Sequence, residues 1–139
     1  MIKSNHKVLL AIDGSADDAW KIIGGVSGVE QWLAPITSCR TEGNKRICGT
    51  EDGEFEENIL EVNDVSKTLR YAIPKQHLIP IGYVEGTMKV IENGNTQIEW
   101  NWEFDVEESK EAEAKEILTG VGTMGIQGID ALIKKSTAA

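Results

Sequence analysis

The feature that most constrains the fold is an amphipathic helical pattern near the end of the chain, which runs from about Ser109 to Lys135 and contains four glycines. Each glycine inside a helix costs about 0.8–1 kcal/mol relative to alanine, so four of them indicate that side chains are absent for a reason. The inward face predicted by the helical period is Ile117, Leu118, Val121, Met124, Gly125, Gly128 and Leu132. Gly125 and Gly128 therefore indicate either very close packing or an interior space. Gly120 and Gly122 lie at the edges of this face.

The middle of the chain has the pattern of an antiparallel meander. The predicted strands are Ile36–Glu42, Lys45–Thr50, Glu54–Val62, Thr68–Pro74, Gly82–Glu92 and Thr96–Val106. In the last of them Ile98, Trp100 and Trp102 alternate with polar residues, which predicts one buried and one exposed face. Asn93-Gly94 is the strongest turn signal and favours a type I′ hairpin.

Two short helices are predicted before the meander. An apolar strand, Lys7–Ile12, is followed by Ser15, whose spacing to Asp18 is typical of a helix N-cap. Ser27 and Glu30 form a capping box, and the second helix must end before Pro35. The order β-αα-β6-α predicts a single α+β domain, residues 1–139, with one antiparallel sheet and its helices on one side.

Composition excludes several functional classes. The net charge of −9 argues against nucleic acid and anionic membrane surfaces as partners. No apolar run reaches the roughly 20 residues that span a bilayer, and no signal-peptide pattern opens the chain, so we expect a cytoplasmic protein. Monomer and homodimer both remain open.

Cys39 and Cys48 flank a predicted turn at Gly43-Asn44 and should lie opposite each other on paired strands. A disulfide is geometrically conceivable, but buried free thiols are predicted for a cytosolic chain. The two cysteines and two histidines lack the spacing of metal ligands, and no phosphate-binding glycine loop follows a strand. We therefore expect neither a metal nor a cofactor.

Motifs along nearly the whole chain resemble the START-like superfamily of helix-grip proteins. This superfamily includes Bet v 1-type proteins, plant abscisic acid receptors and bacterial polyketide cyclase/dehydrase-like proteins. The motifs are Ala16-x-x-Ala19-Trp20, Trp32-x-x-Pro35, Glu57–Asp64 continuing into Leu69-Arg70-Tyr71, and Ile98-Glu99-Trp100 before the long helix. The resemblance implies a curved antiparallel sheet wrapped around the C-terminal helix, with an apolar ligand pocket between them.

The resemblance also implies pocket positions, which are Glu57, Tyr71, Ile73, His77, Tyr83, Glu85, Trp100, Met124 and Gly128. Periodicity independently adds Trp102, Val121 and Gly125. Thr37 stands where the hormone receptors carry a lysine for the ligand carboxylate, so the receptor function is not transferred.

Several roles stay open. Glu57 either faces solvent or lies in the pocket, where an unpaired carboxylate could act as an acid or base or accept a ligand hydrogen bond. His77 is either an exposed loop residue or a proton shuttle at the pocket mouth. Trp100 and Trp102 either line a cavity or fill the space left by the glycines.

Three functions follow as hypotheses. The first is binding of a small apolar, ring-containing or lipid-like molecule between the sheet and the C-terminal helix, with Glu57, Tyr71 and Tyr83 as polar contacts. The second is a cyclase/dehydratase-type enzyme that uses the same cavity, with Glu57 or His77 as acid/base. The third is a protein-interaction module without a ligand.

Overall fold

The computed structural model describes residues 1–137. Its elements are β1 (Ile2–Ile12), α1 (Ala16–Gly24), η1 (Val29–Gln31), β2 (Ser38–Glu42), β3 (Lys45–Thr50), β4 (Gly53–Asn63), β5 (Thr68–Ile73), β6 (Val84–Asn93), β7 (Asn95–Val106), η2 (Glu108–Lys110) and α2 (Glu111–Thr137). Most predicted strand bounds agree within two residues. The first strand is longer than predicted, because it begins at Ile2 and pairs with β7 along its whole length.

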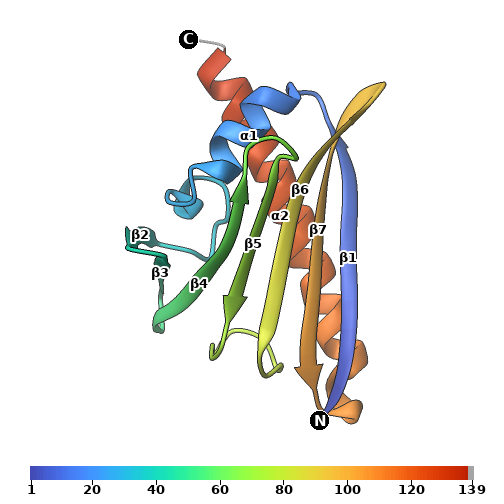
Figure 1. The fold of residues 1–139 in the computed structure, drawn as a ribbon. Coiled ribbons are helices and arrows are strands. Elements are labelled where there is room, and N and C mark those ends of the chain that lie inside the picture. The colour runs from blue at the N-terminus through green and yellow to red at the C-terminus, as the bar shows by residue number, and fades with distance from the viewer. Residues whose placement is uncertain (138–139) are drawn as a thin grey trace.

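One antiparallel sheet in the order β1-β7-β6-β5-β4-β3-β2 curves around α2. Figure 1 shows α2 crossing one face of this sheet, with α1 close to the C-terminal part of α2. The predicted helix-grip fold is therefore confirmed.

The strands that face α2 alternate between buried and solvent-facing residues. In β7 the side chains of Ile98, Trp100, Trp102 and Phe104 are buried, as the alternating pattern predicts. In β6 the inward positions begin at Val84 and continue through every second residue. Their side chains meet the buried face of α2 and form the core of the molecule.

The second short helix is only one turn of 3₁₀-helix, and its predicted capping box is wrong. Ser15 does cap α1, accepting a hydrogen bond from the Asp18 backbone N–H at 3.1 Å. By contrast, the residue before η1 is Gly28, which has a φ of 81° and makes no side-chain cap. Val26 also has a positive φ, of 67°, so the backbone on either side of Ser27 turns away from the geometry of a capping box.

The type I′ turn predicted at Asn93-Gly94 is also wrong. Such a turn needs a positive φ at both central residues. Gly94 has a φ of 82°, but Asn93 is not among the positive-φ residues of the described chain. Glu92 pairs with Thr96, and the hairpin closes around Gly94.

The inward face of α2 is rotated relative to the prediction. Its buried residues are Ala114, Leu118, Gly122, Gly125, Ile126, Ile129 and Ile133. Met124, predicted to point inward, is 45% exposed, and Gly122 rather than Gly128 faces the sheet. The prediction placed Gly122 at the edge of the face, whereas in the structure it is buried against Val8 and Trp102.

Three of the helical glycines allow close packing, each against a different partner. A Cβ on Gly122 would lie 2.7 Å from Val8 and 2.9 Å from Trp102, and one on Gly125 would lie 2.7 Å from Trp100. A Cβ on Gly128 would overlap the backbone carbonyl of Trp32. Gly120 has open space around it.

Candidate ligand-binding cavity

A cavity of about 300 Å³ lies between α2, the inner face of the sheet and two loops. The loops are the segment around η1 and the connection between β5 and β6. Most of its wall is apolar, and the lining residues are Val29, Trp32, Leu33, Pro35, Ile36, Arg46, Cys48, Phe55, Glu57, Tyr71, Ile73, Gln76, Leu78, Ile79, Ile81, Val84, Trp100, Trp102, Ile117, Leu118, Val121 and Met124. This volume is at the lower end of the range of about 300–1,000 Å³ for small-molecule sites.

Glu57 lies in the cavity wall as half of a buried ion pair with Arg46. The side chains of both residues are 5% exposed, and Arg46 Nη2 donates to Glu57 Oε2 at 2.6 Å. Arg46 Nε donates to Glu57 Oε1 at 3.0 Å, so the pairing is bidentate. Glu57 is therefore not the unpaired carboxylate that an acid/base role was expected to require.

Strand register explains why these two side chains meet. Arg46 on β3 is the cross-strand partner of Glu57 on β4. A bulge between Ile59 and Glu61 then changes the register, and Leu60 and Val62 are exposed while Glu57 faces inward. The side-chain alternation in the sequence left this orientation ambiguous because both faces of β4 carry apolar residues.

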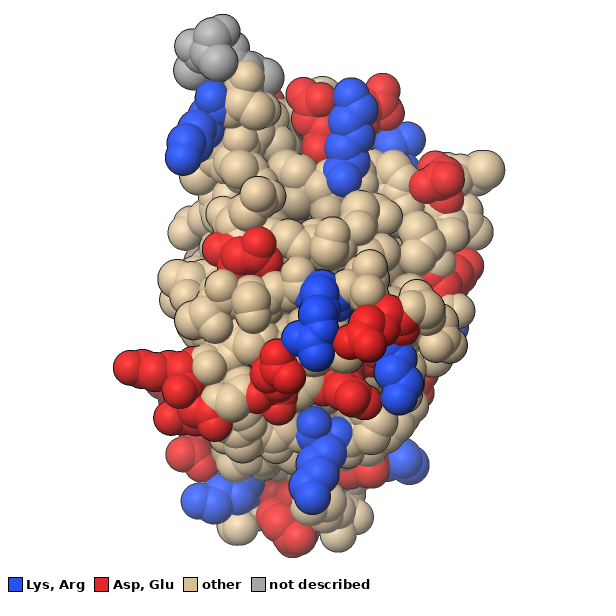
Figure 2. All heavy atoms as spheres, turned by 90° about the vertical axis from the view of Figure 1, so that its left-hand side faces the viewer, with Lys and Arg blue, Asp and Glu red and all other residues tan. Residues whose placement is uncertain are grey.

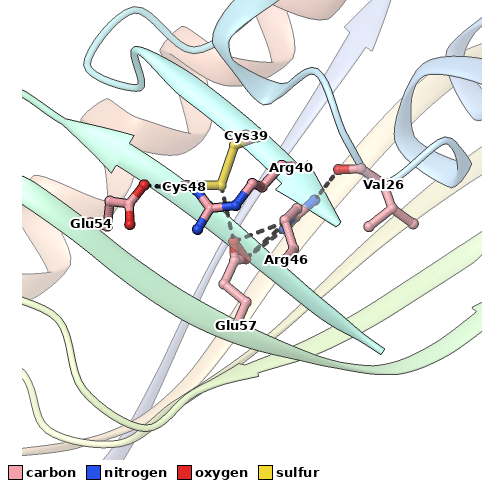
Figure 3. The surroundings of a disulfide bond; sticks show 7 residues. All are labelled: Val26, Cys39, Arg40, Arg46, Cys48, Glu54 and Glu57. Carbon is pink, nitrogen blue, oxygen red and sulfur yellow. Dashed lines mark hydrogen bonds and ion pairs between the residues drawn. A yellow bond between two sulfur atoms is a disulfide. The ribbon is translucent and has the colours of Figure 1, made fainter. Parts of the chain in front are cut away.

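Arg46 also makes two other contacts. Figure 3 shows it between Glu57 and the backbone carbonyl of Val26, to which Nη1 donates at 2.8 Å. Its guanidinium carbon lies 5.3 Å from the centre of the Tyr71 ring, a cation–π distance. Arg46 thus holds the turn before η1 against the sheet and covers one side of Tyr71.

Tyr71 is buried at the inner surface of the sheet, with an exposed fraction of 3%. Its ring lies across Gly86 on β6, where any Cβ would overlap it. Trp100 Nε1 donates a hydrogen bond to Tyr71 Oη at 2.8 Å. Burial raises the pKa of this phenol far above its usual value, and the nearby charge of Glu57 raises it further. The charge of Arg46 and the hydrogen bond from Trp100 oppose the rise.

Trp32, Trp100 and Trp102 form an aromatic cluster between the sheet and α2. The rings of Trp100 and Trp102 are 4.9 Å apart at their centres, and Trp32 meets Trp100 edge-on at 5.8 Å. These rings fill the space left by Gly122 and Gly125, and the same rings line the cavity. The two roles that the sequence presented as alternatives are both present.

Cys39 and Cys48 form a disulfide between β2 and β3, so the prediction of free thiols is wrong (Figure 3). The two residues are direct cross-strand partners with their Cα atoms 4.2 Å apart. The prediction put more weight on an assumed reducing compartment than on this pairing. Cys48 also lines the cavity, and its sulfur lies 3.8 Å from Glu57 Oε1.

Five of the predicted pocket positions lie outside the cavity wall, and four of them are Tyr83, Glu85, His77 and Gly128. Tyr83, just before β6, is exposed, and Glu85 faces the other side of β6 because Val84 and Gly86 take the inward positions. Glu85 pairs with Arg70 at 3.2 Å. His77 is in a separate surface hollow and lies 3.2 Å from Thr50 Oγ1. Gly128 packs on the Trp32 backbone.

The remaining predicted positions have clear locations. Ile73, Val121 and Met124 line the cavity together with Glu57, Tyr71, Trp100 and Trp102. Gly125 lies behind the wall, against Trp100 and Trp32. Arg46 was not among the predicted positions, because only the register of β3 against β4 places it across from Glu57.

The charged side chains outside the cavity do not form a second candidate site among the described residues. Lys/Arg and Asp/Glu side chains are interspersed on the face shown in Figure 2, and the Arg40–Glu54 ion pair links β2 to β4 across β3. Among the described residues, no group of three or more His, Cys, Asp or Glu side chains could hold a metal ion. None of the helices in the described part of the chain is long and apolar enough to cross a membrane.

A family model described as "Polyketide cyclase / dehydrase and lipid transport" matches residues 1–134. No curated protein sequence matches the chain.

Several solved structures have the same architecture, and each can be superposed on nearly the whole chain. An uncharacterised protein from Bacillus thuringiensis has a TM-score of 0.83 at 24% identity, over 94% of this chain and 98% of that one. The protein XoxI from Bacillus cereus has a TM-score of 0.80 at 24% identity, over 96% of each chain. Norcoclaurine synthase from Thalictrum flavum, in complex with a transition-state analogue, has a TM-score of 0.75 at 16% identity, over 98% of this chain and 97% of that one. At these identities the likeness shows a shared fold.

Proposed function

The chain belongs to the polyketide cyclase/dehydrase and lipid transport family, and from this premise we propose that it binds a small apolar, ring-containing or lipid-like molecule in the cavity beneath α2. The observation that carries the proposal is the composition of the cavity wall. Aromatic and aliphatic side chains surround a volume of about 300 Å³, and the only charged side chains among the lining residues, Arg46 and Glu57, neutralise each other. Such a wall favours an apolar ligand with few polar groups.

The two other hypotheses have less support. An acid/base enzyme would need Glu57 or His77 as a proton carrier, but Glu57 is bound bidentately by Arg46 and His77 lies in a different hollow. A protein-interaction module without a ligand gives no reason for an apolar cavity inside the core. Binding rather than turnover is therefore our proposal.

Titration with N-phenyl-1-naphthylamine, a neutral probe whose fluorescence rises in apolar surroundings, tests the proposal. We expect one probe per chain, and a Val121→Trp variant should lose most of the signal because the new ring fills the cavity. Gln127→Trp is the matched control, since Gln127 is on the exposed side of α2. Absence of probe binding to the wild type, or equal binding to both variants, would refute the cavity as a ligand site.

A cytoplasmic location is also part of the proposal and rests on the sequence pattern alone. The Cys39–Cys48 disulfide points the other way, because cytosolic proteins rarely keep structural disulfides. Fractionation of cells expressing the full chain, with thiol labelling before lysis, decides between the two. Recovery in the cytosolic fraction with labelled thiols supports the location, and recovery outside it with protected thiols contradicts it.

A further inference from the structure

We infer that Tyr71 makes the cavity selective for ligands that carry a neutral hydrogen-bond acceptor, such as a ketone on a ring system. This inference rests on the proposed function and concerns the polar end of the same cavity. It follows from three properties of the site, which are the donor that Tyr71 leaves unused, the fixed position of its ring and the charge balance around it.

The first property is the hydrogen bonding of the Tyr71 hydroxyl. Its oxygen accepts from Trp100 Nε1 at 2.8 Å. An indole N–H only donates, so Trp100 cannot accept the hydroxyl proton. Glu57 acts on Tyr71 through its charge rather than through a hydrogen bond. The hydroxyl therefore has a proton to donate, and Tyr71 lines the cavity.

The second property is the fixed position of the ring. On one side the ring lies against Gly86, where there is no side chain to lift it from the sheet. On the other side the Arg46 guanidinium lies 5.3 Å from the ring centre. The hydroxyl is thus held in place before any ligand arrives, which lowers the entropic cost of forming a hydrogen bond to it.

The third property is the charge balance of the site. Arg46 already donates through Nε and Nη2 to Glu57 and through Nη1 to the Val26 carbonyl. A ligand carboxylate would lose its hydration without binding an unpaired cation, because Arg46 is already paired with Glu57. A ligand amine would likewise lose its hydration, because the Glu57 carboxylate is already bound by Arg46. A neutral acceptor avoids both costs. Because Trp100 contacts the hydroxyl and packs on Trp102 in the cavity wall, the group that bears the acceptor should be a flat ring.

A pair of ligands of equal shape tests the inference. 2-Acetylnaphthalene carries a ketone oxygen, and 2-isopropenylnaphthalene has a methylene group in its place. Their affinities are measured by displacement of N-phenyl-1-naphthylamine from the wild type and from Tyr71→Phe. We expect the affinity ratio of ketone to alkene to fall about fivefold or more in Tyr71→Phe, which is the effect of one neutral hydrogen bond.

The control is Tyr83→Phe, which removes the other tyrosine hydroxyl of the chain at a position outside the cavity, and it should leave the ratio unchanged. We also expect 2-naphthoate and 2-naphthylmethylamine to bind the wild type at least tenfold more weakly than the ketone. Tighter binding of either charged compound would overturn the selectivity for neutral ligands.

The outcomes separate the two proposals. If both compounds bind but the ratio is the same in the wild type and Tyr71→Phe, the role of Tyr71 is refuted while the cavity remains a ligand site. If neither compound displaces the probe and the probe itself does not bind, both proposals fail.

A second measurement needs no variant and so does not depend on whether Tyr71→Phe folds. The infrared carbonyl band of 2-acetylnaphthalene bound to the wild type should lie below its frequency in hexane, because a hydrogen bond weakens the C=O bond. A bound band at the hexane frequency would overturn the inference.

Discussion

Arg46 and Glu57 show how one cross-strand pair can define the polar part of an otherwise apolar interior. Both side chains are 5% exposed, so each depends on the other to compensate for lost hydration. The sequence alone could identify Glu57 as a pocket candidate, because a carboxylate in a strand is conspicuous. It could not reveal the partner, since that depends on a register set by the turn between β3 and β4.

We predict that Arg46→Met lowers the free energy of unfolding by about 3–5 kcal/mol, because it leaves a buried carboxylate unpaired. The double variant Arg46→Met, Glu57→Leu should recover most of this loss, since two apolar side chains can replace a buried ion pair at little cost. Urea denaturation followed by circular dichroism measures both. A double variant as unstable as the single one would show that the loss comes from packing rather than from the unpaired charge.

His6 provides a pH-dependent contribution to stability. Its ring is stacked on Trp102 and lies 2.7 Å from Thr119 Oγ1 on α2, so it joins β1 to the helix. Partial burial lowers the pKa of His6 below 6.5, and the charge of Lys115 lowers it further. The folded state disfavours the protonated ring. The contribution of His6 to the free energy of unfolding is therefore complete above about pH 6.5 and is lost as the pH falls below that value.

We therefore expect the wild type to lose stability between pH 7 and pH 5, and a His6→Asn variant to lose less over the same range. Thermal melts at half-unit pH steps provide the comparison. Parallel pH curves for the two proteins would contradict this assignment.

At the scale of elements, α2 contains glycines with opposite effects. The sequence showed that a helix with four glycines needed an explanation, but it assigned the inward positions to Gly125 and Gly128. In the structure Gly122 and Gly125 face aromatic and aliphatic side chains, and Gly128 meets the backbone of Trp32. No periodicity calculation could identify that last contact, because it depends on the path of the chain after η1.

A matched pair of substitutions separates these roles. Gly120→Ala should stabilise the protein by about 0.5–1 kcal/mol, because a methyl group at this open position only improves helix propensity. Gly128→Ala should destabilise it by about 1–3 kcal/mol, because the same methyl group overlaps the Trp32 carbonyl. Urea titrations of both variants measure the difference. Equal changes in the two would show that helix propensity alone determines the effect.

The disulfide between β2 and β3 acts on a single hairpin. The cysteines are 9 residues apart, so the bond closes a short loop, and we expect its reduction to lower the free energy of unfolding by about 2–3 kcal/mol. Denaturation with and without dithiothreitol tests this. In a Cys39→Ser, Cys48→Ser variant the free energy of unfolding should not change when the reductant is added. If it does not change in the wild type either, the disulfide does not stabilise the protein.

At the scale of the whole molecule, the cavity joins parts of the chain that are far apart in sequence. Its wall includes Val29 of η1, Ile81 after β5 and Met124 on α2. Order of elements and periodicity were enough to predict one antiparallel sheet with its helices on one side, and the family resemblance implied that the sheet wraps around the C-terminal helix. Neither was enough to predict the cavity wall, because Tyr83 and Glu85 each differ from the inward Val84 by one position in the sequence.

Since the wall spans the chain, ligand binding should stabilise the fold as a unit. At a free probe concentration 100 times its dissociation constant, we expect N-phenyl-1-naphthylamine to raise the free energy of unfolding by about 2.7 kcal/mol. The melting temperature should rise with probe concentration in the wild type and stay constant in Val121→Trp. An equal rise in both proteins would indicate probe binding outside the cavity.

The pairing of β1 with β7 joins the first and last strands of the sequence. Ile2 pairs with Val106, and each later residue of β1 pairs with an earlier residue of β7. During synthesis β1 therefore has no strand partner until almost all of the sheet has been translated, and α2 follows later still. Contacts this distant in sequence slow folding and leave apolar strands exposed while it proceeds. Because α2 supplies part of its wall, the cavity cannot form before α2 packs against the sheet.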